Sequence, residues 1–198
     1  RTPALAALAA VAALAASHAA PAAEIITVRS GQVGGNPGSV GQLDDIVTYL
    51  PNNPAGTAIS ASPFTAADFS GAVSGPAAVV ISPYSVWTPG LSDAAARWIN
   101  YSLSADGTPF GAPGSSLYAV PFFVTTANAS SAFLQLEFAV DDWLGDWPGS
   151  GGNPDGLYIN GASLGYQGAG YAAPSFHNQT IAVNSGLNYL YFYQRDAG

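Results

Sequence analysis

Residues 133–140 read Phe-Leu-Gln-Leu-Glu-Phe-Ala-Val, and this stretch decides the fold class of the chain. Its apolar side chains fall on one side of an extended backbone: Leu134, Leu136, Phe138 and Val140. Gln135 and Glu137 fall on the other side. A period of two is typical of a strand with one buried face. The stretch therefore predicts a half-buried β-strand.

The sequence on either side carries the same kind of pattern. It contains 23 Gly and 15 Pro, and no stretch of it keeps a helical period over three turns. An all-β fold follows, with a two-layer sandwich as the expected architecture. The expected strands are 24–29, 45–50, 77–82, 116–126, 132–140, 157–160, 162–165, 179–183 and 188–193.

Three strand features can be predicted locally. Asn160-Gly161 separates two short apolar runs, and this dipeptide readily takes the positive φ angles of a type I′ hairpin turn. In 188–193, aromatic and aliphatic residues occupy both faces, so both faces should be covered. Pro121 lacks an N–H, which predicts an edge strand or a bulge at that position.

Helix is expected only in two short pieces. Thr65 can cap a helix over 65–69. Ser92 can cap a second helix over 91–100, with Asp93 near the positive end of its dipole. Neither piece is long enough to form a layer of the fold.

Residues 1–22 predict a signal peptide. Residues 3–16 are almost pure Ala, Leu and Val, too short to cross a hydrocarbon core of ~30 Å, and Ser17-His18-Ala19 supplies small residues for cleavage. An Ala-rich surface helix is the alternative, but this segment has no polar face. We therefore expect a secreted or cell-surface protein with no membrane span in its mature chain, in which 23–198 form a single domain.

Composition excludes several function classes. Only 8% of the residues are charged, and the net charge of -8 disfavours nucleic acid and anionic lipid as partners. Without cysteine there is no disulfide, thiolate nucleophile or cysteine-based metal site. Beyond the predicted signal peptide the chain has one histidine, His177, and no Gly-x-Ser-x-Gly elbow. The sequence therefore predicts a protein that is not an enzyme.

Three motifs in the last part of the chain resemble a known family. They are Val140-Asp141-Asp142, Tyr158-Ile159-Asn160-Gly161 and Gly186-Leu187-Asn188. In this order they resemble the galactose-binding-like jelly-roll sandwich found in carbohydrate-binding modules. Upstream, three features are similar to modules of secreted bacterial proteins of the PEP-CTERM type: Trp87, the run Ala96-Arg97-Trp98-Ile99 and the run from Tyr118 to Val124. The resemblance implies a jelly-roll β-sandwich at the cell surface.

The segment 141–156 gathers the residues that could bind a metal ion. Its oxygen-bearing side chains are Asp141, Asp142, Asp146, Asn153 and Asp155. Ca²⁺ prefers six to eight oxygen ligands, so this loop is a candidate calcium site, although its spacing is not that of an EF-hand. The alternative is that Asp141 or Asp142 shapes the turn by accepting backbone N–H bonds and that the other side chains are solvated.

Aromatic side chains near this loop are candidates for ligand binding. They are Trp143, Trp147, Tyr166 and Tyr171. A flat ring matches the C–H face of a sugar, so these rings predict a site for a polysaccharide or cell-surface glycan. The alternative for Trp143 and Trp147 is packing over the end of the sandwich. The expected function is a non-catalytic carbohydrate-binding or matrix-associated module; the alternatives are a purely structural matrix protein or an accessory domain of a glycoside hydrolase.

Overall fold

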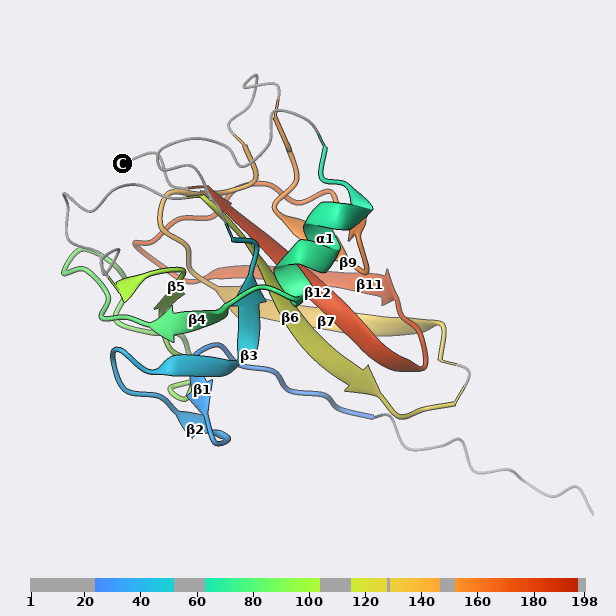
Figure 1. The fold of residues 1–198 in the computed structure, drawn as a ribbon, viewed down its shortest axis with the longest axis horizontal. Helices are drawn as coiled ribbons and strands as arrows, with labels where there is room; N and C mark the ends of the chain where they lie inside the picture. Colours follow the sequence, from blue (N-terminus) through green and yellow to red (C-terminus); the bar gives the residue numbers. More distant parts are fainter. Residues whose placement is uncertain (1–23, 52–62, 104–114, 128, 147–151, 196–198) are drawn as a thin grey trace, which may run out of the picture.

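The computed structural model describes residues 24–51, 63–103, 115–127, 129–146 and 152–195 (Figure 1). The predicted signal peptide and Trp147 lie outside the described residues. Within them the predicted all-β sandwich is confirmed, with antiparallel sheets and one short helix. The jelly-roll connectivity stays a prediction.

Two sheets of unequal size make the sandwich. The large sheet has the order β10 (Ala162–Ser163), β9 (Leu157–Ile159), β12 (Gly186–Arg195), β6 (Ser116–Val124), β3 (Leu43–Tyr49), β4 (Ala77–Val80) and β5 (Ile99–Asn100), and β8 (Trp143–Leu144) also pairs with β12. The small sheet contains β7 (Ser131–Phe138) and β11 (Ser175–Ala182). A separate hairpin joins β1 (Gln32–Val33) to β2 (Asn36–Pro37).

Both faces of β12 are covered, as the pattern of 188–193 predicts. Helix α1 (Ala66–Val73) lies on one face, and the small sheet lies against the other (Figure 1). On the α1 side, Tyr191 and Tyr193 pack in one cluster with Phe69. On the other side, Phe192 packs on Phe138, with ring centroids 6.2 Å apart.

The helix at Thr65 is confirmed and continues to Val73. The Thr65 side chain accepts from the Asp68 N–H while the Asp68 carboxylate accepts from the Thr65 N–H, which is a capping box. Phe69 then anchors the helix, with its ring centroid 4.8 Å from that of Tyr191. No helix of the described part has the length and hydropathy needed to cross a membrane.

The predicted helix over 91–100 is wrong. Its last two residues, Ile99 and Asn100, form β5 and pair with β4 instead. The Asp93 carboxylate accepts from the Ala95 N–H, which closes a turn in place of a helical start. Trp98 packs on Trp87 with ring centroids 4.7 Å apart, so a tertiary contact outweighs the weak helix signal.

The hairpin at Asn160-Gly161 is confirmed, because both residues have positive φ, 50° and 84°, between β9 and β10. Pro121 lies in a strand that pairs on both sides, with β12 and β3. The ladder with β3 ends at Ala119, however, and Tyr189 opposite Pro121 directs its backbone toward Asn160. The backbone nitrogen of Pro121 therefore points away from β12, toward the side on which β3 no longer pairs with β6. No ladder hydrogen bond is lost there.

Candidate functional site

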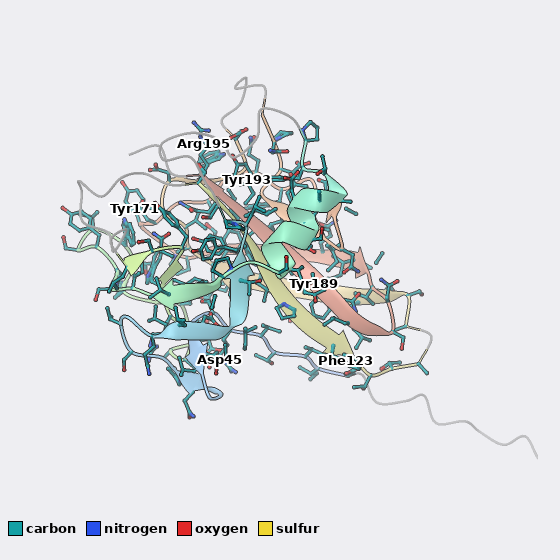
Figure 2. All side chains as sticks on the ribbon, in the orientation of Figure 1. Asp45, Phe123, Tyr171, Tyr189, Tyr193 and Arg195 are labelled. Carbon is teal, nitrogen blue, oxygen red and sulfur yellow. The ribbon has the colours of Figure 1, made fainter. Side chains whose placement is uncertain are left out.

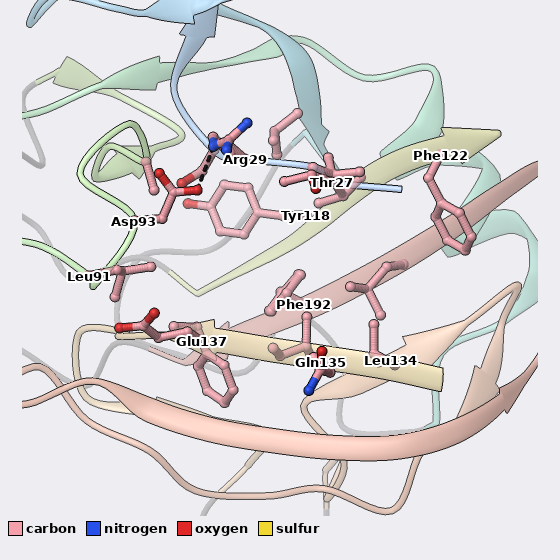
Figure 3. Close-up of a pocket in the computed structure, with 18 of the residues that line it drawn as sticks. Thr27, Arg29, Leu91, Asp93, Tyr118, Phe122, Leu134, Gln135, Glu137 and Phe192 are labelled. Atoms are coloured by element: carbon pink, nitrogen blue, oxygen red, sulfur yellow. Dashed lines mark hydrogen bonds and ion pairs between the residues drawn. The ribbon is translucent and has the colours of Figure 1, made fainter. Parts of the chain in front are cut away.

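The large sheet is only partly covered by the small one, and a cleft opens where the small sheet ends. The cleft lies between β6 and β12 on one side and β7 on the other (Figure 3). Its volume is about 1390 Å³. Residues from the inner faces of both sheets line it. A third strand in the small sheet would cover these residues and close the cleft.

The walls of the cleft are mainly apolar. Val120 and Phe122 of β6 line one wall together with Phe192 of β12, and Leu134 of β7 lines the other (Figure 3). Tyr118 also lines it, and the hydroxyl of Tyr118 lies 3.2 Å from Asn100 Oδ1. Burial raises the pKa of Tyr118 well above its ordinary value, so this side chain stays neutral at physiological pH.

Charged groups gather at the mouth and are paired with neighbours. Arg29 Nε contacts Asp93 Oδ2 at 2.5 Å (Figure 3). The N–H of Ala95, followed by the side chain of Arg29, lowers the pKa of Asp93. The Glu137 carboxylate accepts from the backbone N–H of Ser92 at 2.6 Å and from the Ser92 hydroxyl. Hydrogen-bond donors of neighbouring residues therefore fix the positions of both carboxylates.

Residues 24–29 reach the same mouth, but they do not form the predicted strand. The segment pairs with no strand of the described residues, and Ile25 is 88% exposed. The Glu24 carboxylate accepts from the backbone N–H groups of Thr125 and Thr126, each at 3.0 Å. These bonds, chiefly the one from Thr125, lower the pKa of Glu24 to about 2. Side-chain contacts, not a ladder, thus hold the segment across the cleft.

The predicted calcium ligands take separate roles in the described residues. Asp146 is buried, and its Oδ1 accepts from the Tyr193 hydroxyl at 2.9 Å and from Arg195 Nη1 at 3.1 Å. Figure 2 shows Tyr193 and Arg195 close together at the end of β12. The carboxylate of Asp155 accepts from the Ser163 hydroxyl.

The remaining candidate ligands do not complete a cluster within the part of the chain that is described. Asn153 is buried, and its carbonyl accepts from the Asp146 N–H at 2.8 Å. Asp142 has a φ of 57° and, like Asp141, is half-buried. No group of three or more His, Asp or Glu side chains gathers among the described residues. Calcium binding by the segment 141–156 therefore stays a prediction.

The predicted aromatic ligands pack on different neighbours. Trp143 of β8 lies opposite Arg195 of β12 and is half-buried. Tyr166 contacts Phe138, with ring centroids 5.7 Å apart, and His177, at 4.7 Å. Tyr171 packs on a separate core cluster that contains Val79, Ile81 and Trp87. Trp147 lies outside the described residues.

Sequence reasoning missed the cleft itself, although it identified the strands that form it. The alternation in 133–140 predicts that Leu134 and Leu136 point inward, and both pack toward the core. The alternation in 116–126 places Val120 and Phe122 on one face. Neither pattern indicates how many strands the opposing sheet contains. The sequence therefore could not predict that part of the inner face of β6 is left uncovered.

Comparisons with known proteins give no relative for this chain. No family model, no curated protein and no solved structure matches it. The resemblances to galactose-binding-like and PEP-CTERM-type modules therefore stay predictions, and the functional argument depends on the geometry alone.

Proposed function

We propose that this chain is a non-catalytic binding module that takes an elongated apolar ligand into the cleft between its two sheets. Its export to the cell surface, expected from residues 1–22, belongs to the same proposal. The observation that carries it is the cleft of about 1390 Å³ with mainly apolar walls and a few polar and charged groups. A concave, mostly apolar site with a few polar groups is typical of a ligand pocket.

The state of the carboxylates supports a non-catalytic role. Catalysis of glycoside hydrolysis needs two carboxyl groups that face the same substrate. At this mouth, Asp93 is bound to Arg29, and Glu137 is bound to Ser92. Glu24 is bound to Thr125 and Thr126. Each group therefore stabilises the rim rather than pointing at a common centre.

Binding of the neutral apolar dye Nile red tests the proposal. We expect its fluorescence to rise and saturate on addition of the full chain, because the dye leaves water for the apolar walls. Val120 lines the cleft, so Val120→Trp should narrow it at that point and weaken binding at least tenfold. The neighbouring residue Phe123 points to the opposite face and is 59% exposed, which makes Phe123→Trp the matched control.

Two outcomes decide the matter, provided that circular dichroism shows both variants folded. Equal dye binding by wild type, Val120→Trp and Phe123→Trp would show that the dye binds elsewhere and would overturn the proposal. Absence of saturable binding to the wild type would overturn it as well.

Glycan recognition is the second candidate function. The observation in its favour is Trp143, a half-buried residue of β8 that lies opposite Arg195 at the end of β12. A partly exposed indole ring offers a flat face on which a sugar can stack. A glycan array that compares wild type with Trp143→Ala tests this candidate, since recognition at this ring requires signals that the variant loses.

A further inference from the structure

Strand β7 has one edge that no strand of the described residues pairs with. Its eight residues form a ladder with β11 only. Just beyond that ladder, the N–H of Val183 donates to the carbonyl of Ser130 at 3.2 Å. Backbone groups alternate in direction along an antiparallel strand, so the even-numbered residues of β7 bond to β11. The odd-numbered ones direct N–H and C=O to the free edge: Ser131, Phe133, Gln135 and Glu137.

This free edge borders the cleft. Every residue from 129 to 141 lines it, whatever the direction of its side chain. Strand β6, by contrast, contributes alternate residues only: Tyr118, Val120, Phe122 and Val124. The cleft therefore lies between a face of the large sheet and an edge of the small one, and residues 26–30 also line it (Figure 3).

The inner face of β6 and the free edge of β7 together leave space for one more strand. Neighbouring strands lie about 4.8 Å apart and stacked sheets about 10 Å apart, so a strand added to β7 would cover the inner face of β6. Its backbone would bond to the odd-numbered residues of β7, and every second side chain would reach Val120 and Phe122. A small apolar molecule or a lipid chain would fill the same volume but would leave the backbone groups of that edge unpaired.

The charge at the mouth indicates which strand would be favoured. Four carboxylates and two guanidinium groups line the cleft, and the whole chain has a net charge of -8. A strand whose outward side chains are basic would meet this excess of negative charge.

We propose that the cleft binds an extended segment of another polypeptide, with apolar residues alternating with basic ones, which adds as a third strand to the free edge of β7. This inference rests on the proposed function, since it names the class of elongated ligand. Strand addition of this kind takes its affinity from main-chain hydrogen bonds and its specificity from alternate side chains.

The experiment uses the full chain and a fluorescent peptide with blocked ends, in which valine and lysine alternate over four repeats. We expect saturable anisotropy, competition with Nile red, and at least tenfold weaker binding of a block peptide of the same composition, in which all the valines precede all the lysines. Gln135→Pro removes one N–H from the free edge and should weaken binding of the alternating peptide at least tenfold. The control is Asn178→Pro, because Asn178 is the cross-strand partner of Gln135 and its N–H faces the far edge of β11.

The results separate this inference from the proposed function. Nile red binding without peptide binding, or peptide binding unaffected by Gln135→Pro, overturns strand addition and leaves an apolar ligand. If the wild type binds neither Nile red nor the peptide, the proposed function is overturned too. If the protein without peptide sediments as a dimer and Gln135→Pro dissociates this dimer, then a second copy of the chain pairs with the free edge of β7. In that case the inference is wrong.

Discussion

A buried ion pair joins Asp146, which follows β8, to Arg195 at the end of β12. An aspartate in a Gly-rich acidic loop is as good a candidate for a calcium ligand as for a buried counter-ion. Its actual partner, Arg195, is 49 residues away in the sequence, and so no local spacing connects them. The side chain of Asp146 is 1% exposed and that of Arg195 is 14% exposed, so this pair is shielded from solvent.

Removing one member of this pair should be costly. We predict that Arg195→Met lowers the free energy of unfolding by about 3 kcal/mol, because it leaves the buried Asp146 carboxylate without its counter-charge. The double variant Arg195→Met/Asp146→Asn should recover much of that loss. Urea denaturation measures both. A loss below about 0.5 kcal/mol for Arg195→Met would mean that the pair is solvated and weak.

At the scale of elements, sequence reasoning succeeded where the signal is local. The alternation of β7, the Asn160-Gly161 turn and the Thr65 cap each depend on residues within a few positions of one another. It failed for 91–100 and 24–29, whose structure is set by distant partners. Trp98 contacts Trp87, and Glu24 bonds to Thr125, 101 residues along the chain.

The bonds from Thr125 and Thr126 to Glu24 tether the segment 24–29, and this tether should depend on pH. The pKa of Glu24 falls from 4.5 to about 2 in the folded chain, so its bonds to Thr125 and Thr126 stabilise the tether fully above pH 4.5. That stabilisation is lost as the pH falls toward 2. We predict that the amides of Ile25 and Val28 become mobile over this range, which ¹⁵N relaxation measures.

The variant Glu24→Ala is the control for this titration, because other carboxylates also protonate in acid. In this variant the amides of the same segment should already be mobile at pH 5, and below pH 2 the wild type should match it. Equal mobility of the wild type at pH 5 and pH 2 would contradict the role given to Glu24.

At the scale of the whole molecule, the sandwich was predictable but the imbalance of its sheets was not. Alternation identifies a buried face without identifying what buries it. Within the described residues, the two stacked sheets contain ten strands, of which eight belong to one sheet and two to the other. Val124 of β6 packs in one cluster with Ile181 of β11, and the inner face of β6 lines the cleft from Tyr118 to Val124.

An open cleft and a packed core respond in opposite ways to a larger side chain, and alanines of the two sheets allow the comparison. Ala132 of β7 is half-buried and lines the cleft, whereas Ala119 of β6 is fully buried under α1. We predict that Ala132→Leu raises the free energy of unfolding by about 1 kcal/mol, since the added carbons are removed from water without displacing neighbours. Ala119→Leu should lower it by about 2 kcal/mol through overpacking. Urea midpoints of the two variants measure the difference, and a loss of similar size in both would show that the sheets close on each other in solution and leave no cleft for a ligand.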